Sequence, residues 1–301
     1  MDDFEQLSDT HREDVQAVIP TVWAKKIETA ARPMRVFREH IRFDNSLLNK
    51  PGDEVRIPRR SELTAAAIGE AGTITPSTLT YSTALVLTPT EYGVAVSLSR
   101  QAISRANENL IEAATTELAQ ALSQIEDTTI RDELNQATSN QLYCGSATGT
   151  ADITVTDVLT PEKLTLAARE LRKNNWNPTD IFLSPEQQYS LGTCIEFTNS
   201  ASWGNREVIT KGVIPQWMGM KVHTTTNVPS GLGGTAVDVA YHTAFCMDSK
   251  AAGAIAIKRN ISVDVQYEPL SRKRTIAATL DFDSGIINDS AICTITSADG
   301  A

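Results

Sequence analysis

The chain offers one weak arrangement for nucleophilic catalysis. Many hydrolases place the nucleophile in a Gly-x-Ser-x-Gly turn, and the nearest stretch, residues 145–149, reads Gly-Ser-Ala-Thr-Gly with Ala147 at that position. Ser146 is the remaining nucleophile candidate, and its base would be His223 or His242, which could meet across strands. Isolated strand histidines are more often surface or core residues than catalysts. We therefore expect no catalytic residue, and an α+β hydrolase stays a distant alternative.

Metal and phosphate chemistry also lack a recognisable pattern. The cysteines are about fifty residues apart and form no Cys-x-x-Cys or Cys/His pair, which indicates reduced thiols; they are Cys144, Cys194, Cys246 and Cys293. The glycine-rich stretch 231–234 has no Lys-Ser/Thr after it and predicts a hairpin or surface loop. Asp281 and Asp283 share one side of a predicted strand and could hold a divalent cation, although such carboxylates are usually solvated. We expect no cofactor and no metal.

The net charge argues against a protein that grips nucleic acid. The 301 residues carry 27 basic and 37 acidic side chains, a net charge of −10, whereas DNA-binding proteins usually have a basic surplus. Residues 1–14 carry −5 and residues 25–60 carry +5. This pattern indicates either an N-terminal segment that reaches towards partners or a frayed, solvated terminus.

Basic side chains supply our candidates for contacts between subunits, with phosphate contact as the alternative. These candidates are Arg56, Arg59, Arg60, Arg272, Lys273 and Arg274. No run of about 18 apolar residues occurs, which excludes a transmembrane helix. The acidic, polar N-terminus does not have the pattern of a signal peptide, and we expect a chain made and kept in the cytoplasm.

The N-terminal third alternates between helical and extended patterns. Residues 19–43 place apolar side chains three or four apart and predict a helix, broken or restarted at Pro33. Within residues 46–98, the stretch 59–90 is rich in threonine and small residues, and Tyr92–Leu98 alternates with the period of a strand. We predict a long two-stranded β-hairpin there that lies on another subunit, with a disordered loop as the alternative.

The rest of the chain predicts a mixed α and β fold. Residues 99–137 contain no glycine or proline and predict one helix of about 50 Å, with Ile125 in its apolar stripe. A second helix begins at Pro161. Residues 176–249 alternate short strands with turns and a helix that begins at Pro185, as in a compact α+β unit, and the remainder is rich in strands.

The order of these parts, together with several segments, resembles the major capsid proteins of tailed double-stranded DNA bacteriophages, the Hong Kong 97-type coat fold. Segments 50–58 and 92–105 are similar to the start and the return of that family's extended loop. Segments 181–191, 212–222 and 244–253 are similar to its strand–Pro–helix, the stretch before its central strands, and its return to the peripheral domain. The resemblance spans about residues 22 to 297.

The resemblance implies an α+β capsid fold with an N-terminal arm, an extended loop, and peripheral and axial domains. In this sequence the parts would be the arm 1–45, the loop 46–98, the peripheral domain 99–175 and 250–301 with its spine helix 99–137, and the axial domain 176–249. Because only about 20 residues precede the first predicted helix, we expect a separate scaffold protein or none.

The implied function is that of a major capsid protein. Copies of the chain would form pentamers and hexamers of an icosahedral shell around double-stranded DNA, assembled in the host cytoplasm and kept in the virion. Expected partners are other copies, a scaffold if one is used, a portal, decoration proteins and loosely held DNA, with no membrane. An encapsulin-type shell is the alternative within the same fold. Some relatives are cross-linked through Lys and Asn, but Lys50 lies in no matching motif.

Overall fold

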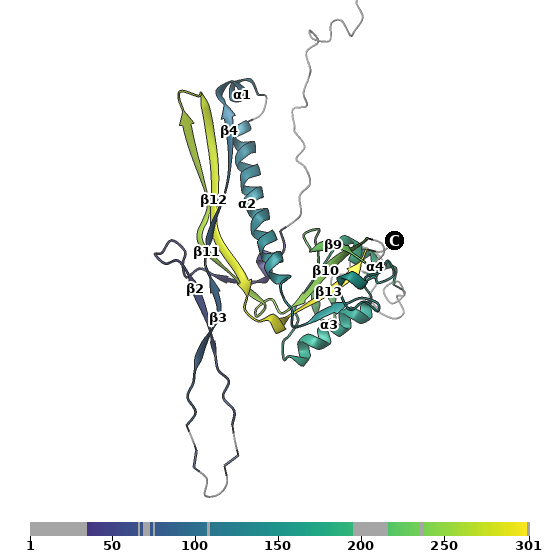
Figure 1. The fold of residues 1–301 in the computed structure, drawn as a ribbon. Coiled ribbons are helices and arrows are strands. Elements are labelled where there is room, and N and C mark those ends of the chain that lie inside the picture. The colour runs from purple at the N-terminus through teal and green to yellow at the C-terminus, as the bar shows by residue number, and fades with distance from the viewer. Residues whose placement is uncertain are drawn as a thin grey trace, which may run out of the picture.

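The structure is a computed structural model that describes residues 35–65, 67–68, 73–74, 76–106, 109–194, 216–234 and 238–299. Figure 1 shows an elongated part made of long strands and helix α2, beside a compact part that contains the C-terminus. Both parts combine helices and sheets, so the predicted α+β class is confirmed. Among the described residues no helix is long and apolar enough to cross a membrane.

The elongated part is a four-stranded sheet. Its strand order is β1 (Arg42–Asp44), β11 (Gly253–Glu268), β12 (Lys273–Ile286) and β4 (Thr90–Ser99). β11 and β12 form a long antiparallel hairpin, and β4 runs antiparallel along β12. Every second residue of β12 from Ile276 to Phe282 is buried, as alternation along a strand requires.

Helix α2 (Leu110–Leu134) packs along this sheet and is shorter than predicted. The single helix expected over residues 99–137 is wrong, because α1 (Arg100–Arg105) ends at Ala106, whose backbone is extended. The 25 residues of α2 span about 37 Å at 1.5 Å per residue. Ser99 caps α1 by accepting a hydrogen bond from the Ala102 N–H.

The buried face of α2 also differs from the predicted stripe. The core-facing line advances in steps of four, through Leu118, Leu122, Glu126, Ile130 and Leu134. Ile125, which we expected in the stripe, is 38% exposed. The carboxylate Glu126 occupies a buried position on this face of the helix, where an apolar residue was expected. The spacing of apolar residues therefore predicted Ile125, its neighbour in the chain, as the buried residue.

β2 (Val55–Arg60) and β3 (Tyr81–Leu87) form a separate antiparallel hairpin. This pairing confirms the prediction of a two-stranded hairpin for these residues, in place of the alternative of a disordered loop. The predicted return up to Leu98 is wrong, because residues 90–99 form β4 in the long sheet. Pro89 lies between β3 and β4 and has no N–H for a strand ladder, which favours a break there.

The compact part is a seven-stranded sheet, and helices α3 and α4 belong to it among the described residues. Its order is β5 (Gln141–Tyr143), β13 (Ile292–Ala298), β10 (Val239–Met247), β6 (Asp180–Leu183), β8 (Met220–Thr224) and β7 (Gln216–Trp217), and β9 (Ser230–Gly233) pairs with β10. Helix α3 (Pro161–Lys173) buries the predicted face at Leu164, Ala167, Ala168 and Leu171. Helix α4 (Pro185–Thr193) begins with a capping box between Ser184 and Gln187.

This compact sheet draws on residues outside the range 176–249 that we expected to hold the whole α+β unit. β5 precedes that range and β13 follows it, yet both are hydrogen-bonded into the sheet. The core beneath the sheet joins the buried residues of α3 to Cys246 and Cys293. β5 and β13 are more than a hundred residues apart in the sequence but pair in this sheet. Local composition does not reveal such pairing, which explains why the predicted range 176–249 contains only part of the compact sheet.

The N-terminal segment is only partly described. Residues 1–34 of the predicted arm, with most of its helix, lie outside the described residues. The remainder of the predicted helix 19–43 is wrong: residues Phe37–His40 form a 3-10 turn, η1, and the chain then extends into β1. β1 pairs parallel with β11, and Arg42 lies opposite Ala254, so a sheet edge determines the local backbone here.

Candidate functional site

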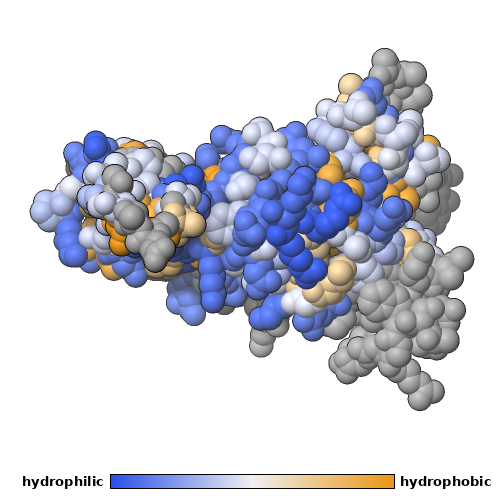
Figure 2. Space-filling view, turned by 90° about the horizontal axis from the view of Figure 1, so that it is seen from below, coloured by the Kyte–Doolittle hydropathy of each residue, from blue (hydrophilic) through white to orange (hydrophobic). Residues whose placement is uncertain are grey.

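The β2–β3 hairpin extends away from the rest of the chain (Figure 1), and its segment exposes large apolar side chains. Leu63, Ile74 and Tyr81 are 59%, 72% and 66% exposed. Figure 2 views the molecule from below and shows a mostly hydrophilic face with hydrophobic residues in small, separate patches. A two-stranded hairpin is only marginally stable by itself in water, and exposed apolar residues on such a hairpin are suited to contact with another surface.

The base of the hairpin is fixed to the long sheet by a small core of its own. The buried members of that core are Leu47, Val55, Ile57, Leu87, Ala254 and Ala256. Gly285 permits the close approach, because a Cβ there would lie 2.9 Å from Leu85 Cδ1. Arg59 donates from Nη2 to the carbonyl of Ile287 at 3.0 Å and to the side chain of Asn288. The structure thus places the predicted contact residue Arg59 in a bond within its own chain.

A cleft of about 890 Å³ lies between the hairpin base and the compact part. Arg59, Arg60 and Tyr81 line one side, and Trp176 and Asp289 line the other. Arg60 is exposed there, while the neighbouring candidate Arg56 forms a surface ion pair with Glu54 at 2.6 Å. The cleft therefore offers both a guanidinium group and aromatic surface to an incoming chain.

The second predicted basic group lies at the opposite end of the long sheet. Arg272 has a positive φ of 51° in the β11–β12 turn, and Lys273 and Arg274 begin β12. Arg272 and Arg274 line a cavity of about 290 Å³ with Arg100, Ile103 and Tyr267. Figure 1 shows this turn near α1, far from the β2–β3 hairpin, so the two groups form separate surfaces.

The described residues do not bring the suggested hydrolase side chains together. His223 is on β8 and His242 on β10, and β6 lies between them. The ring of His242 contacts Asp299 instead, and among the described residues no hydrogen bond joins Ser146 to either histidine. The glycine-rich stretch 231–234 contributes β9, which pairs with β10 and confirms the predicted hairpin.

Among the described residues, Asp281 and Asp283 on β12 belong to no group of three potential metal ligands. Asp283 accepts a hydrogen bond from the backbone N–H of Thr88 at 2.7 Å. This bond holds the connection between β3 and β4 against β12. Within the part of the chain that the structure describes, the one group of three potential metal-ligating side chains lies elsewhere, at His40, Asp180 and His223. Sequence reasoning missed this group because its members are up to 183 residues apart.

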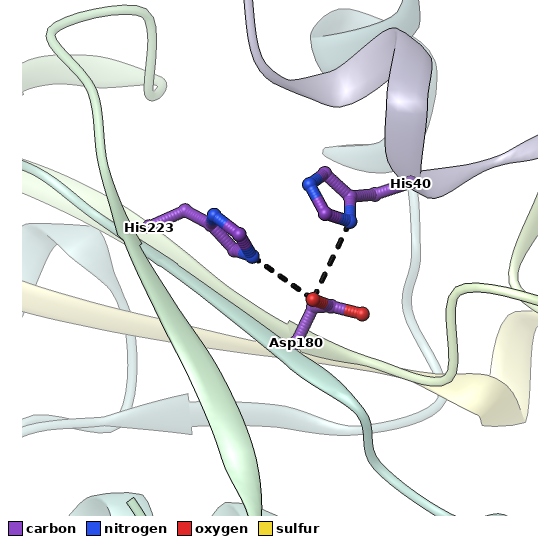
Figure 3. A group of neighbouring side chains, drawn as sticks. All are labelled: His40, Asp180 and His223. Atoms are coloured by element: carbon purple, nitrogen blue, oxygen red, sulfur yellow. Dashed lines mark hydrogen bonds and ion pairs between the residues drawn. The ribbon is translucent and has the colours of Figure 1, made fainter. Parts of the chain in front are cut away.

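The His40–Asp180–His223 cluster joins the end of η1 to two strands of the compact sheet (Figure 3). Asp180 Oδ1 is 2.9 Å from His223 Nε2 and 3.3 Å from His40 Nδ1. Phe182, which lies opposite His223 in the β6–β8 register, packs against both imidazoles, with ring centroids 5.1 and 5.3 Å away. Elements from both parts of the molecule therefore meet at one carboxylate.

Local contacts favour a neutral His40 and a charged Asp180 in this cluster. Burial lowers the pKa of His40, and the nearby His223 lowers it further. Burial alone would raise the pKa of Asp180, but hydrogen bonds from Ser249, Thr179 and His223 outweigh it and lower that pKa below its usual value. Imidazole nitrogens that face a carboxylate form a set of donors that divalent transition metals bind.

A second buried polar group fixes the start of η1. Asp127 on α2 accepts backbone N–H bonds from Val36, Phe37 and Arg38 at 3.2, 2.9 and 3.3 Å. Its other oxygen accepts a bond from Asn227 Nδ2 at 2.8 Å. One carboxylate of α2 thus holds the N-terminal segment and the loop after β8 together.

The adjacent Glu126 is fully buried on the same helix. Its Oε2 pairs with Arg38 at 2.8 Å, while Oε1 has no hydrogen-bond partner among the described residues. Burial raises the pKa of Glu126, and the charge of Arg38 opposes that shift only in part. Neighbouring carboxylates on α2 therefore both serve to attach the N-terminal segment.

Comparison with known proteins gives one family match and several similar folds. A model of the phage capsid protein family matches residues 82–295, more than two thirds of the chain, and no curated protein matches in sequence. The capsid of Cyanophage Pam1 superposes with a TM-score of 0.76 at 12% identity, covering 95% of this chain and 98% of that one.

Two further capsids superpose nearly as well. That of Cyanophage P-SCSP1u gives a TM-score of 0.75 at 13% identity, over 95% of each chain. That of Ralstonia phage GP4 gives 0.73 at 15% identity, over 94% of this chain and 96% of that one. Neither these structures nor the family match supports the encapsulin or hydrolase alternative. The long sheet, its helix, the extended hairpin and the sequence match together show that the chain belongs to the phage capsid protein family.

Proposed function

We propose that this capsid protein is the major coat subunit, which associates with copies of itself as pentamers and hexamers of an icosahedral shell. The observation that carries the proposal is the β2–β3 hairpin, whose apolar side chains the described part of its own chain leaves exposed. Burying one such leucine or isoleucine contributes about 2 kcal/mol. Several of them on each subunit favour a contact repeated around a ring.

In this proposal the parts of the fold have separate roles in the lattice. Residues 1–45 are an N-terminal arm and the hairpin within 46–98 is an extended loop, both reaching towards neighbouring subunits. The long sheet with α2 is a peripheral domain whose spine is α2, and the compact sheet is an axial domain around the symmetry axis. The axial domain then includes β5, α3 and β13 in addition to residues 176–249.

The basic side chains are proposed as contacts with acidic surfaces of neighbouring copies. Arg60 at the cleft and the group Arg272, Lys273 and Arg274 at the far turn are available for such contacts, whereas Arg59 supports the hairpin base from within. A chain with a net charge of −10 presents acidic partners on every copy. Opposite charges also guide the approach of subunits and fix their register.

The remaining partners follow from the same role. A shell that encloses double-stranded DNA must release it, and an acidic coat is suited to loose, non-specific contact. We further propose assembly in the host cytoplasm, a portal at one vertex, and a scaffold or decoration protein encoded nearby. The capsid role itself places the chain in the virion.

Shortening the hairpin tests the proposal directly. Ser61 and Thr80 face each other through hydrogen bonds of 2.9 and 3.0 Å, so residues 62–79 can be replaced by Asn-Gly, which favours a tight hairpin turn. We expect the full chain to form closed shells or rings in negative-stain electron microscopy and sedimentation. The shortened chain should keep its thermal stability and remain monomeric.

Val155→Ser is the matched control, because Val155 is 54% exposed on the compact part and its replacement should leave assembly unchanged. A gentler triple variant, Leu63→Ser with Ile74→Ser and Leu79→Ser, should weaken assembly without altering the hairpin length. Shells formed equally well by the shortened chain would contradict the proposed role of the hairpin. A wild-type chain that stays monomeric even with its candidate scaffold would contradict the proposed function.

A further inference from the structure

We propose that His40, Asp180 and His223 form a binding site for a divalent transition metal ion of the Zn²⁺ type. The three side chains come from η1, β6 and β8, and one potential ligand atom from each lies within 4.8 Å of the others. The site is independent of the hairpin contacts described above. Its effect would be to join the N-terminal segment to the compact sheet.

The distances suit coordination by nitrogen and oxygen. Zinc binds imidazole nitrogen and carboxylate oxygen at about 2.0–2.2 Å, so neighbouring ligands of a tetrahedral ion are roughly 3.4 Å apart. Asp180 Oδ1 is already 2.9 Å from His223 Nε2 and 3.3 Å from His40 Nδ1. Small rotations of the imidazoles would bring both nitrogens and this oxygen around one ion (Figure 3).

The carboxylate is held by neighbours of the kind that support metal ligands. Thr179 Oγ1 donates to Asp180 Oδ2 at 2.6 Å, and Ser249 Oγ also donates to that oxygen. Thr179 Oγ1 in turn accepts the backbone N–H of Ser249 at 3.1 Å. Because two hydroxyl groups donate to Oδ2, the carboxylate is held with Oδ1 towards the two histidines. Outer-shell hydrogen bonds orient ligands in metal sites in the same way.

The surroundings provide support on one side and access on the other. Phe182 packs against both imidazoles and restricts their orientation. The side chains of His40 and His223 are 18% and 23% exposed, whereas that of Asp180 is 6% exposed. An ion can therefore enter from solvent, and three protein ligands leave a fourth position for water.

Metal binding at this point would stabilise the junction between the two parts of the fold. His40 follows the turn held by Asp127, so the ion would add a second attachment for the segment that leads to the N-terminal arm. Any ligand that binds the folded chain and not the unfolded one raises its stability by mass action. A Zn²⁺-dependent rise in melting temperature follows from the proposal.

The experiment uses the full chain, freed of metal with a chelator and titrated with Zn²⁺ by calorimetry, and with Co²⁺ by visible absorption. We expect saturable binding of one ion per chain, with a Co²⁺ spectrum of nitrogen and oxygen ligands. His223→Gln and His40→Gln should each weaken Zn²⁺ binding at least tenfold. Ser249→Ala keeps all three ligands and should weaken binding by roughly 10-fold.

His242→Gln is the matched control, because His242 also pairs with an aspartate, Asp299, but lies outside the cluster. Each variant is compared with its own metal-free melting temperature, so a loss of intrinsic stability does not obscure the loss of the Zn²⁺ response. The proposal is overturned if wild type shows no saturable binding, or if His223→Gln binds as wild type does. An intense sulfur-to-cobalt absorption band, which would place the ion on cysteine, overturns it as well.

Discussion

The attachment of the N-terminal segment to α2 should depend on the charge of Asp127. This side chain is 1% exposed and accepts three backbone N–H bonds and one from Asn227. In Asp127→Asn the new amide oxygen still accepts from the backbone of η1, but its NH₂ group then faces the NH₂ of Asn227. The variant therefore loses one buried hydrogen bond and the charge that strengthens the other three.

The expected cost follows from these contacts. A hydrogen bond to a charged group contributes about 1.5–3 kcal/mol, so we expect Asp127→Asn to lower the free energy of unfolding by about 2 kcal/mol. Asp127→Ala also removes the acceptor for three backbone groups, and because a buried donor left without a partner costs about 1–3 kcal/mol, its loss should exceed that of Asp127→Asn. Either loss is a large part of the total of about 5–15 kcal/mol typical of a folded protein.

Urea unfolding of the unassembled chain, followed by far-ultraviolet circular dichroism, measures this effect. At a slope of about 2–3 kcal/mol per molar urea, Asp127→Asn should lower the midpoint by roughly 1 M. Asp132→Asn is the matched control: Asp132 is on the same helix, is 58% exposed and pairs with Arg131. Exposed pairs contribute about 0–1 kcal/mol, so its midpoint should barely change.

Exchanging the polar groups at positions 127 and 227 tests the role of Asp127. Combining Asp127→Asn with Asn227→Asp restores a carboxylate opposite the amide, and Arg131 Nη1, now 3.0 Å from Asn227 Oδ1, can pair with it. We expect the double variant to recover at least about 1 kcal/mol of the loss, as coupled neighbours do. Equal midpoints for Asp127→Asn and Asp132→Asn, or no recovery in the double variant, would refute the role assigned to Asp127.

Three further outcomes follow from buried groups. Burial raises the folded-state pKa of Glu126 above 4.5, so as pH falls the folded chain takes up this proton before the unfolded chain does. The stability of wild type relative to Glu126→Gln should therefore rise as pH falls from that raised pKa to about 4.5. Urea titrations of both proteins at each pH measure this change. Gly145→Ala should cost more than about 2 kcal/mol, measured by thermal unfolding, since Gly145 has a φ of 60° and a Cβ there would lie 1.6 Å from Asp157 Oδ1. Alkylation of the native chain near pH 8 should modify Cys194 alone, because the other three thiols are buried and burial raises their pKa values. Mass spectrometry counts the labels, and rapid labelling of two or more cysteines would contradict the burial of these three thiols.

Local patterns in the sequence predicted the elements that local physics controls. Alternation from Tyr92 to Leu98 gave a real strand, and Pro161 marked the start of a real helix. The same patterns failed where a distant partner decides the backbone. Arg42 and Phe43 were predicted as helix but lie in a strand, because the edge of β11 supplies the hydrogen bonds.

Sequence patterns were sufficient to predict the α+β class, the paired strands of the hairpin, the starts of helices α3 and α4 and, through the order of segments, the resemblance to phage coat proteins. Long-range packing sets where the sheets begin and end, attaches the N-terminal segment to two carboxylates of α2, and brings His40, Asp180 and His223 together. Each of these contacts joins residues more than forty positions apart. A periodic pattern records which side of an element is buried, but carries no information about which distant element covers it.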